Sequence, residues 1–110
     1  MFGVGAIKEK LEEAKRKAEE TKVRLDSVYV EGSSGDYAKV VSSANSRIMQ
    51  IILNDEAKEF SHAELCRHIQ IATNEALDKA RGIYELEMSA VAKEALPNIP
   101  GLGGLGGMFK

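Results

Sequence analysis

The sequence contains no tryptophan, one cysteine and two prolines, and aromatic residues make up only 5% of its 110 residues. So few aromatic side chains argue against binding of nucleic acid by base stacking on aromatic rings. The single cysteine, Cys66, excludes a disulfide within the chain and suits a reducing compartment. No apolar run approaches the roughly 20 residues of a membrane-spanning helix. The apolar start, Phe2 to Ile7, is too short for a signal peptide. We therefore expect a soluble cytoplasmic protein with no membrane association.

A strong excess of one charge is also missing, because 15 Lys and Arg against 17 Asp and Glu give a formal net charge of −2. This balance argues against a highly basic, histone-like mode of binding, but it leaves room for a local basic patch. A chain of 110 residues fits one domain. A core of that size is marginal, so burying a hydrophobic surface against a second copy would add stability.

The hydrophobic period changes along the chain, and these changes predict an α+β domain. From the N-terminus we expect a helix over 5–26, strands over 27–31, 37–43 and 46–53, and a helix over 62–96. Turn-forming residues separate the strands at 32–36 and 44–45, and Ser61 with Glu64 forms a capping box before the last helix. The prediction is a helix, a three-stranded antiparallel meander and a long C-terminal helix (αβββα). It occupies a single domain, 1–96, with a flexible Gly/Pro-rich tail over 97–110.

The third predicted strand is apolar on both faces. Met49, Ile51 and Leu53 alternate on one face, and Ile48, Gln50 and Ile52 alternate on the other. A sheet that helices cover on one side needs only one apolar face. We therefore predict that Ile48, Gln50 and Ile52 lie in the interface of a homodimer.

The first helix carries a sorted charge pattern. Its apolar positions alternate four and three residues apart, as in a heptad seam: Ile7, Leu11, Ala14, Ala18, Thr21 and Leu25. The positions that flank this seam are all basic, with Lys8, Lys15 and Lys22 on one edge and Lys10, Lys17 and Arg24 on the other. Rows of this kind suit the neutralisation of phosphates at regular intervals. The predicted contacts to double-stranded DNA are Lys8, Lys10, Lys15, Lys17 and Lys22, with Arg16 and Arg24 as helpers.

The same residues allow another interpretation, in which the first helix pairs with the last one. Glu85, Glu87 and Glu94 lie beside the apolar stripe of the last helix and could pair with some of the bases. Three acids cannot match six bases, so some lysines should stay free. A symmetric homodimer through the seam is disfavoured, because basic flanks would face basic flanks.

Other motifs predict neither a catalytic nor a metal site. Gly101 to Gly106 matches a dinucleotide fingerprint in spacing, but it lacks the strand and helix that the fingerprint requires. His62 and Cys66 lie one helical turn apart, whereas His68 points away from Cys66. We expect no enzyme activity, no metal, no cofactor and no small-molecule substrate. A metal-dependent enzyme using His62 and Cys66 across a dimer is a distant alternative.

Several segments together resemble the YbaB/EbfC nucleoid-associated proteins. The similar stretches are Met1-Phe2-Gly3, the charged helix followed by Val30 to Gly35, Lys39-Val40-Val41, Ile48 to Asp55, Glu64-Leu65, Ala72 to Ala76, Lys79-Ala80 and the Pro/Gly/Met/Phe tail. Their order and spacing extend over most of the chain. One departure lies in the second turn, where the family often has glycines and this chain has Ser43-Ala44-Asn45-Ser46.

The resemblance implies an αβββα subunit that dimerises through its sheet, with helices that project from the dimer and grip duplex DNA. It also implies a role in the bacterial nucleoid, in its organisation and in gene expression. The leading hypothesis is thus a homodimeric DNA-binding protein with low sequence specificity. The competing hypothesis is a dimeric protein-interaction scaffold, in which the lysines serve helix pairing or a protein partner.

Overall fold

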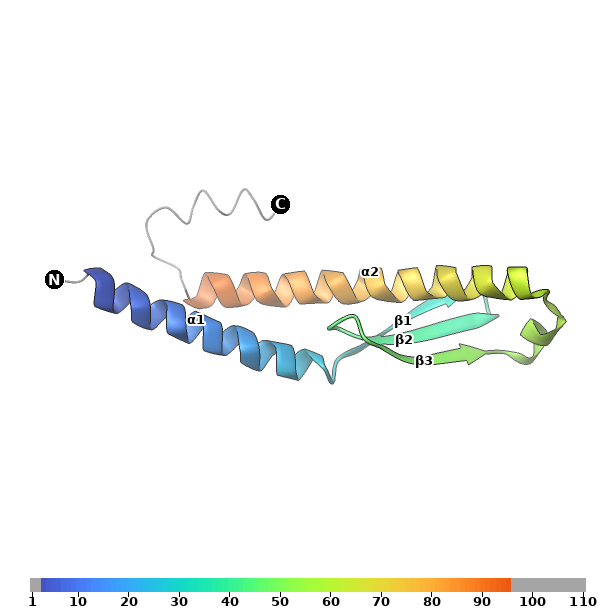
Figure 1. Ribbon diagram of the computed structural model, residues 1–110, viewed down its shortest axis with the longest axis horizontal. Coiled ribbons are helices and arrows are strands. Elements are labelled where there is room, and N and C mark those ends of the chain that lie inside the picture. The colour runs from blue at the N-terminus through green and yellow to red at the C-terminus, as the bar shows by residue number, and fades with distance from the viewer. Residues whose placement is uncertain (1–2, 96–110) are drawn as a thin grey trace.

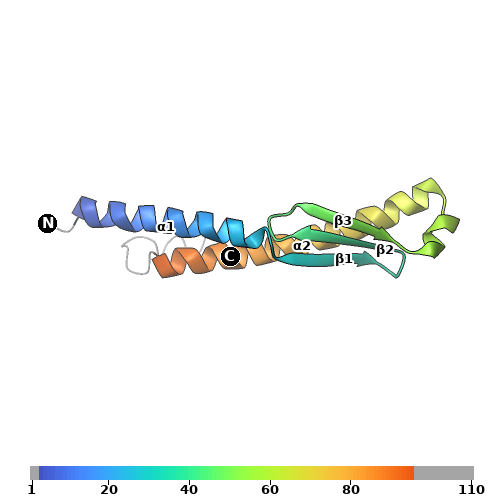
Figure 2. The same cartoon turned by 90° about the horizontal axis from the view of Figure 1, so that it is seen from below.

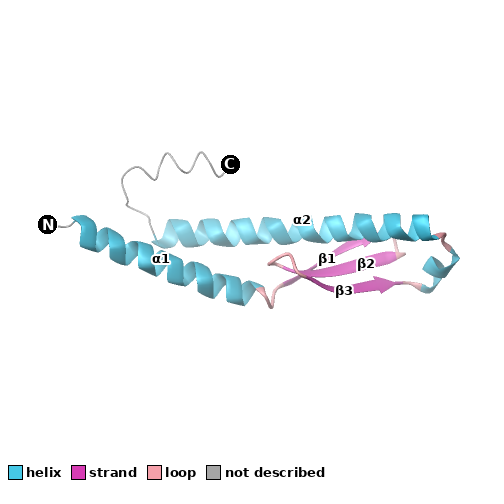
Figure 3. Cartoon of the chain, viewed as in Figure 1, coloured by secondary structure: helices cyan, strands magenta, loops and turns pink. Residues whose placement is uncertain are grey.

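The computed structural model describes residues 3–95, and its elements confirm the predicted αβββα order (Figures 1 and 3). The elements are α1 (Gly3–Leu25), β1 (Tyr29–Ser34), β2 (Ala38–Ser43), β3 (Ile48–Leu53), the short 3-10 helix η1 (Asp55–Glu59) and α2 (His62–Ala95). The tail expected over 97–110 lies outside the described residues. Within 3–95, no helix is both long enough and apolar enough to cross a membrane.

The three strands form an antiparallel sheet in the order β1-β2-β3, so β2 is central and β3 lies at an edge. In the β2–β3 ladder, Val40 lies opposite Ile51 and Val41 opposite Gln50. The register then shifts, and Ser42 lies opposite Ile48, which leaves Met49 as an extra residue in β3. Because directly opposed residues share a face, Ile48 lies on the face of Ser42. The alternation expected through the whole of β3 is therefore interrupted at Met49.

Small residues bring α2 against the sheet. Ala72 and Ala76 of α2 are fully buried, together with Val40 in β2, and they form a compact core with Ala38. Gly32 in β1 faces the α2 backbone so closely that a Cβ atom there would overlap Ala72 and Ala76. The helix therefore lies mainly over β1 and β2. Figure 2 shows the sheet in front of α2.

The first turn is shorter than the sequence pattern predicts. The pattern places Gly32 in a turn over 32–36, but β1 continues to Ser34 and the turn begins at Gly35, whose φ is +55°. The prediction is wrong here because glycine favours turns, whereas Gly32 serves close packing inside a strand. In the second turn Ser46 has a φ of +63°. That left-handed conformation favours glycine, which is the residue type that the resembling family often carries in this turn.

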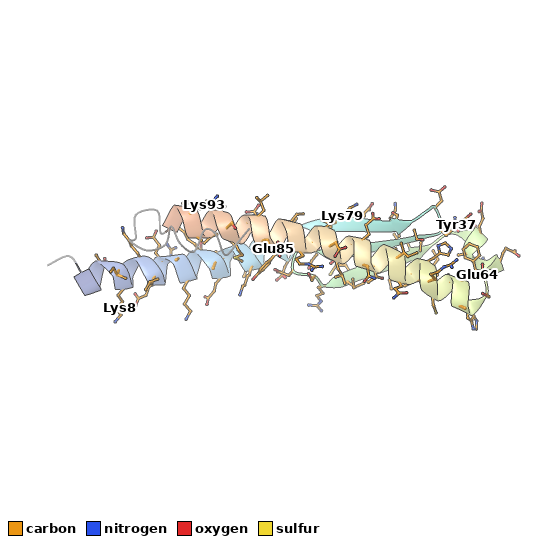
Figure 4. The ribbon with its side chains drawn as sticks, turned by 90° about the horizontal axis from the view of Figure 1, so that it is seen from above. Lys8, Tyr37, Glu64, Lys79, Glu85 and Lys93 are labelled. Carbon is orange, nitrogen blue, oxygen red and sulfur yellow. The ribbon has the colours of Figure 1, made fainter. Side chains whose placement is uncertain are left out.

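The N-terminal end of α2 is fixed by polar and aromatic contacts. The Ser61 hydroxyl accepts from the backbone N–H of Glu64 at 3.2 Å, which confirms the predicted helix start. The Ser61 hydroxyl also lies 3.2 Å from a carboxylate oxygen of Glu64, to which it donates. Nearby, the His68 ring stacks on Phe60 with 4.8 Å between centroids, and Tyr37 meets Phe60 edge-on. These rings close the end of the molecule that is remote from the N-terminus of α1, where Figure 4 labels Tyr37 and Glu64.

Candidate nucleic-acid interface

The candidate interface lies on a helical hairpin that extends away from the sheet. The helix α1 runs antiparallel to the C-terminal half of α2, and both continue beyond the strands (Figure 1). The seam of α1 is buried near the sheet, where Leu25 is fully covered, and becomes exposed toward the tip. Leu11 is 51% exposed. The heptad seam therefore packs on α2 as the helix-pair interpretation predicted, but only over its C-terminal part.

One basic edge of α1 faces α2 and is paired with acids. The Arg24 guanidinium lies 2.9 Å from the Glu87 carboxylate, and the Lys17 ammonium lies 3.5 Å from the Glu94 carboxylate. Lys17 also lies 3.6 Å from Glu13 one turn earlier in α1. Two of the three acids expected as partners thus do pair with this edge. The third acid, Glu85, forms no ion pair among the described residues of α1 and α2.

The other basic edge of α1 carries Lys8, Lys15 and Lys22, all exposed. None of them forms an ion pair with another side chain among residues 5–94. Figure 4 shows Lys8 extending from the side of α1 that lies away from α2. Seven residues of α-helix span about 10.5 Å, so these three ammonium groups form a row with that repeat. This row is a basic edge without ion-pair partners in the described chain, and it can bind anions.

The two remaining predicted contacts differ from each other. Lys10 is exposed and has no ion-pair partner in the described chain, so it adds a free charge near the tip. Arg16 is bound within its own helix, 3.2 Å from Glu20 and 4.0 Å from Glu13. Exposed pairs within one helix contribute only about 0–1 kcal/mol.

The base of α1 is held to the second turn of the sheet by a side-chain amide. The Asn45 amide donates to the backbone carbonyl of Lys22 at 2.7 Å and to the Asp26 carboxylate at 2.6 Å. The first of these bonds satisfies a carbonyl group that a helix C-terminus otherwise leaves open. An open cleft beside them is lined by Lys22, Val23, Asp26, Asn45, Ser46, Arg81 and Tyr84. The turn therefore fixes the direction in which the basic helix leaves the sheet.

The residues predicted for a dimer interface all lie on β3 and are exposed. Gln50 and Ile52 lie opposite Val41 and Lys39, on the sheet face away from α2, whereas Ile48 lies on the α2 side because of the register shift. The other apolar residues of the strand are exposed as well. Ile48, Met49, Ile51, Ile52 and Leu53 are each between 38% and 50% exposed.

The exposure of Ile51 and Leu53 was not predicted. Apolar residues at alternate positions of a strand normally indicate that this face of the strand is covered. The cause is the close packing of Gly32 in β1 against Ala72 and Ala76 of α2. This packing holds α2 over β1 and β2 rather than over β3. The spacing Ala72, Ala76 and Ala80 together with Gly32 was the signal in the sequence that could have revealed this offset.

The soft-ligand residues do not gather into one site. His68 is directed into the sheet side of α2, where its Nδ1 atom lies 2.6 Å from the Ser34 hydroxyl. Cys66 is exposed, and His62 is at the first residue of α2. Within residues 3–95, no three His, Cys, Asp or Glu side chains are close enough together to hold a metal ion.

Two comparisons with known proteins agree with this architecture. The model of the YbaB/EbfC DNA-binding family matches residues 1–95. A nucleoid-associated protein of Flavobacterium johnsoniae is 34% identical over 97 residues, which cover 87% of this chain and 91% of that relative. The matched segment contains the whole basic helix, the sheet and α2. The chain therefore belongs to the YbaB/EbfC DNA-binding family.

Proposed function

We propose that this protein is a nucleoid-associated, cytoplasmic DNA-binding protein that acts as a homodimer and contacts duplex phosphates through α1 with low sequence specificity. The observation that carries the proposal is the row of Lys8, Lys15 and Lys22, which forms no ion pair with an acid of the described chain. Lys10 adds to this surface near the tip. The family of the chain and its nucleoid-associated relative support the same function.

Low specificity follows from the chemistry of the contacts. Lysine ammonium groups that meet phosphates fix the position of a protein on DNA, but they carry no sequence information. Base reading would need groups such as arginine forks or amides directed at base edges. On α1 the arginines are Arg16 and Arg24, and both are paired with glutamates. Binding through the free lysines should therefore be electrostatic and strongly dependent on salt.

A second copy is the occupant that best fits β3. The strand lies at the edge of the sheet, and its outer backbone groups have no strand partner among the described residues. An edge strand with apolar side chains exposed on both faces is a template for pairing with another strand. Its own copy offers the same apolar side chains and the same open ladder, so pairing would bury both. Such a dimer carries two basic hairpins, one from each protomer.

The scaffold hypothesis also has an observation in its favour. Lys17 and Arg24 form ion pairs with α2, which supports a role of this part of the basic surface in helix pairing. The free row on the other edge has no such explanation, and this difference favours DNA as the partner. The experiment below distinguishes the two functions.

The test is fluorescence anisotropy of a labelled duplex of about 30 base pairs, titrated from low to near-physiological salt. We compare the wild type with the variant Lys8→Gln/Lys15→Gln/Lys22→Gln. A matched control, Lys58→Gln/Arg67→Gln/Lys79→Gln, removes the same charge from exposed positions away from α1 and from β3.

The proposal predicts wild-type binding that weakens steeply with salt. In the α1 variant, the slope of log K against log salt should become shallower by about 0.9 for each phosphate that the protein no longer neutralises. The control should keep the wild-type slope. Absence of wild-type binding at low salt would refute the DNA function and leave the scaffold as the explanation of the dimer surface.

A further inference from the structure

The antiparallel pairing of α1 with α2 sets two carboxylates of α2 against two cations of α1. Arg24 lies 2.9 Å from Glu87, and Lys17 lies 3.5 Å from Glu94. The acids are seven residues apart on α2 and the bases are seven apart on α1, so the contacts repeat at heptad spacing. This arrangement covers one edge of α1 with intramolecular anions and leaves the opposite edge free.

Carboxylates and phosphates bind the same groups in the same way. A guanidinium forms charge-assisted hydrogen bonds to either anion, and an ammonium group binds either as a point charge. A cation that is already 2.9 Å from a carboxylate must give up that contact before it can bind a phosphate. We propose that Glu87 and Glu94 are built-in competitors of the DNA phosphates, which hold Arg24 and Lys17 out of the DNA contact and so limit affinity. This inference rests on the DNA-binding function proposed above.

The third base of this edge, Lys10, lies seven residues before Lys17 and forms no ion pair among the described residues. The helix α2 ends at Ala95, one residue after Glu94. The competition is therefore confined to Arg24 and Lys17. Arg24 is the clearer case, because Lys17 also lies 3.6 Å from Glu13.

The test uses the full chain with the single variants Glu87→Gln and Glu94→Gln in the same salt titration of duplex binding. Glu85→Gln is the matched control, because it removes one exposed negative charge from the same helix without releasing a cation in the described structure. Any loss of an acid weakens the general repulsion of DNA. Only a newly neutralised phosphate also steepens the slope of log K against log salt.

Glu87→Gln and Glu94→Gln should each steepen this slope by about 0.9 for each additional phosphate that the protein neutralises. Each such phosphate makes the rise in affinity at 50 mM salt about 3-fold larger than at 200 mM. The control should keep the wild-type slope. Adding Arg24→Gln to Glu87→Gln should abolish the extra slope, because the released cation is then absent. Circular dichroism of each variant checks that the fold persists.

Slopes of Glu87→Gln and Glu94→Gln equal to that of Glu85→Gln, with intact wild-type binding, would overturn this inference alone. An extra slope that survives the addition of Arg24→Gln would also overturn it for the Glu87 pair. Failure of the wild type to bind duplex at low salt would instead refute the proposed function, so the two failures are distinguishable.

Discussion

Gly32 in β1 lies directly against the α2 backbone at Ala76, with no space for a side chain between them. A Cβ atom at Gly32 would overlap the Ala72 carbonyl oxygen and the Ala76 amide nitrogen. Both are backbone atoms, which cannot rotate away as a flexible side chain would. This close approach lets a helix of small residues, Ala72, Ala76 and Ala80, seal the covered part of the sheet.

Substitution Gly32→Ala should therefore destabilise the protein by about 3 kcal/mol, because α2 must move away from β1 and loosen the core around Val40. Urea unfolding followed by far-UV circular dichroism measures this change in the free energy of unfolding. A variant whose unfolding midpoint matches the wild type would show that the helix tolerates displacement from the strand.

Gly82 in α2 is the opposite case. A Cβ atom there would meet no other atom within 4 Å, and the residue is exposed. Gly82→Ala should stabilise the protein by up to about 1 kcal/mol, because alanine loses less backbone entropy in a helix. A thermal scan of both glycine variants tests the contrast. A lower melting temperature for Gly82→Ala would contradict the open surroundings of this position.

The attachment of α1 depends on Asn45. Its amide bonds to the Lys22 carbonyl and the Asp26 carboxylate, so Asn45→Ala should cost about 1–2 kcal/mol of stability. Hydrogen exchange should also accelerate at the end of α1, because the last turn loses its bond to the sheet.

The matched control is Ser46→Ala in the same turn, since the Ser46 side chain has no hydrogen-bond partner among the described residues. Its exchange rates should equal those of the wild type. Equal rates in Asn45→Ala would mean that the helix is held by seam packing alone.

The helices and strands of this fold could be predicted from the periodicity of the sequence, whereas their positions relative to one another could not. Heptad spacing predicted the extent of α1 to within two residues at its start, and Ser61 with Glu64 marked the beginning of α2 correctly. These are local signals that a few neighbouring residues determine. The short η1 helix was missed, although Asn54 caps it by accepting from the Ala57 amide at 3.0 Å.

The candidate site shows the same division. The two basic edges of α1 were visible as heptad positions, and so were the acids that could oppose them. Which edge the acids cover depends on the rotation of α2 about its axis, and contacts far apart in the chain set this rotation. The pairing of Arg24 with Glu87 therefore appears only in three dimensions. The exposure of β3 is likewise a tertiary effect, because it depends on the approach of α2 to Gly32.

The dimer proposal is tested by placing a charge on β3. Ile52 is 41% exposed in the single chain and lies on the sheet face away from α2, so Ile52→Lys should leave the subunit folded. In a symmetric dimer formed through β3, the same change buries one lysine charge from each protomer in the interface. This burial costs several kcal/mol, which is enough to dissociate a marginal interface. Sedimentation velocity at micromolar protein should show a dimer for the wild type and a monomer for the variant.

The matched control is Leu86→Lys, which makes the same chemical change on α2 at a side chain that is 70% exposed. It should sediment with the wild type. DNA binding provides a second measure, because a monomer presents one basic hairpin instead of two, and its salt slope should fall to about half of the dimer's. A dimer that survives Ile52→Lys and dissociates with Leu86→Lys would move the interface from β3 to α2.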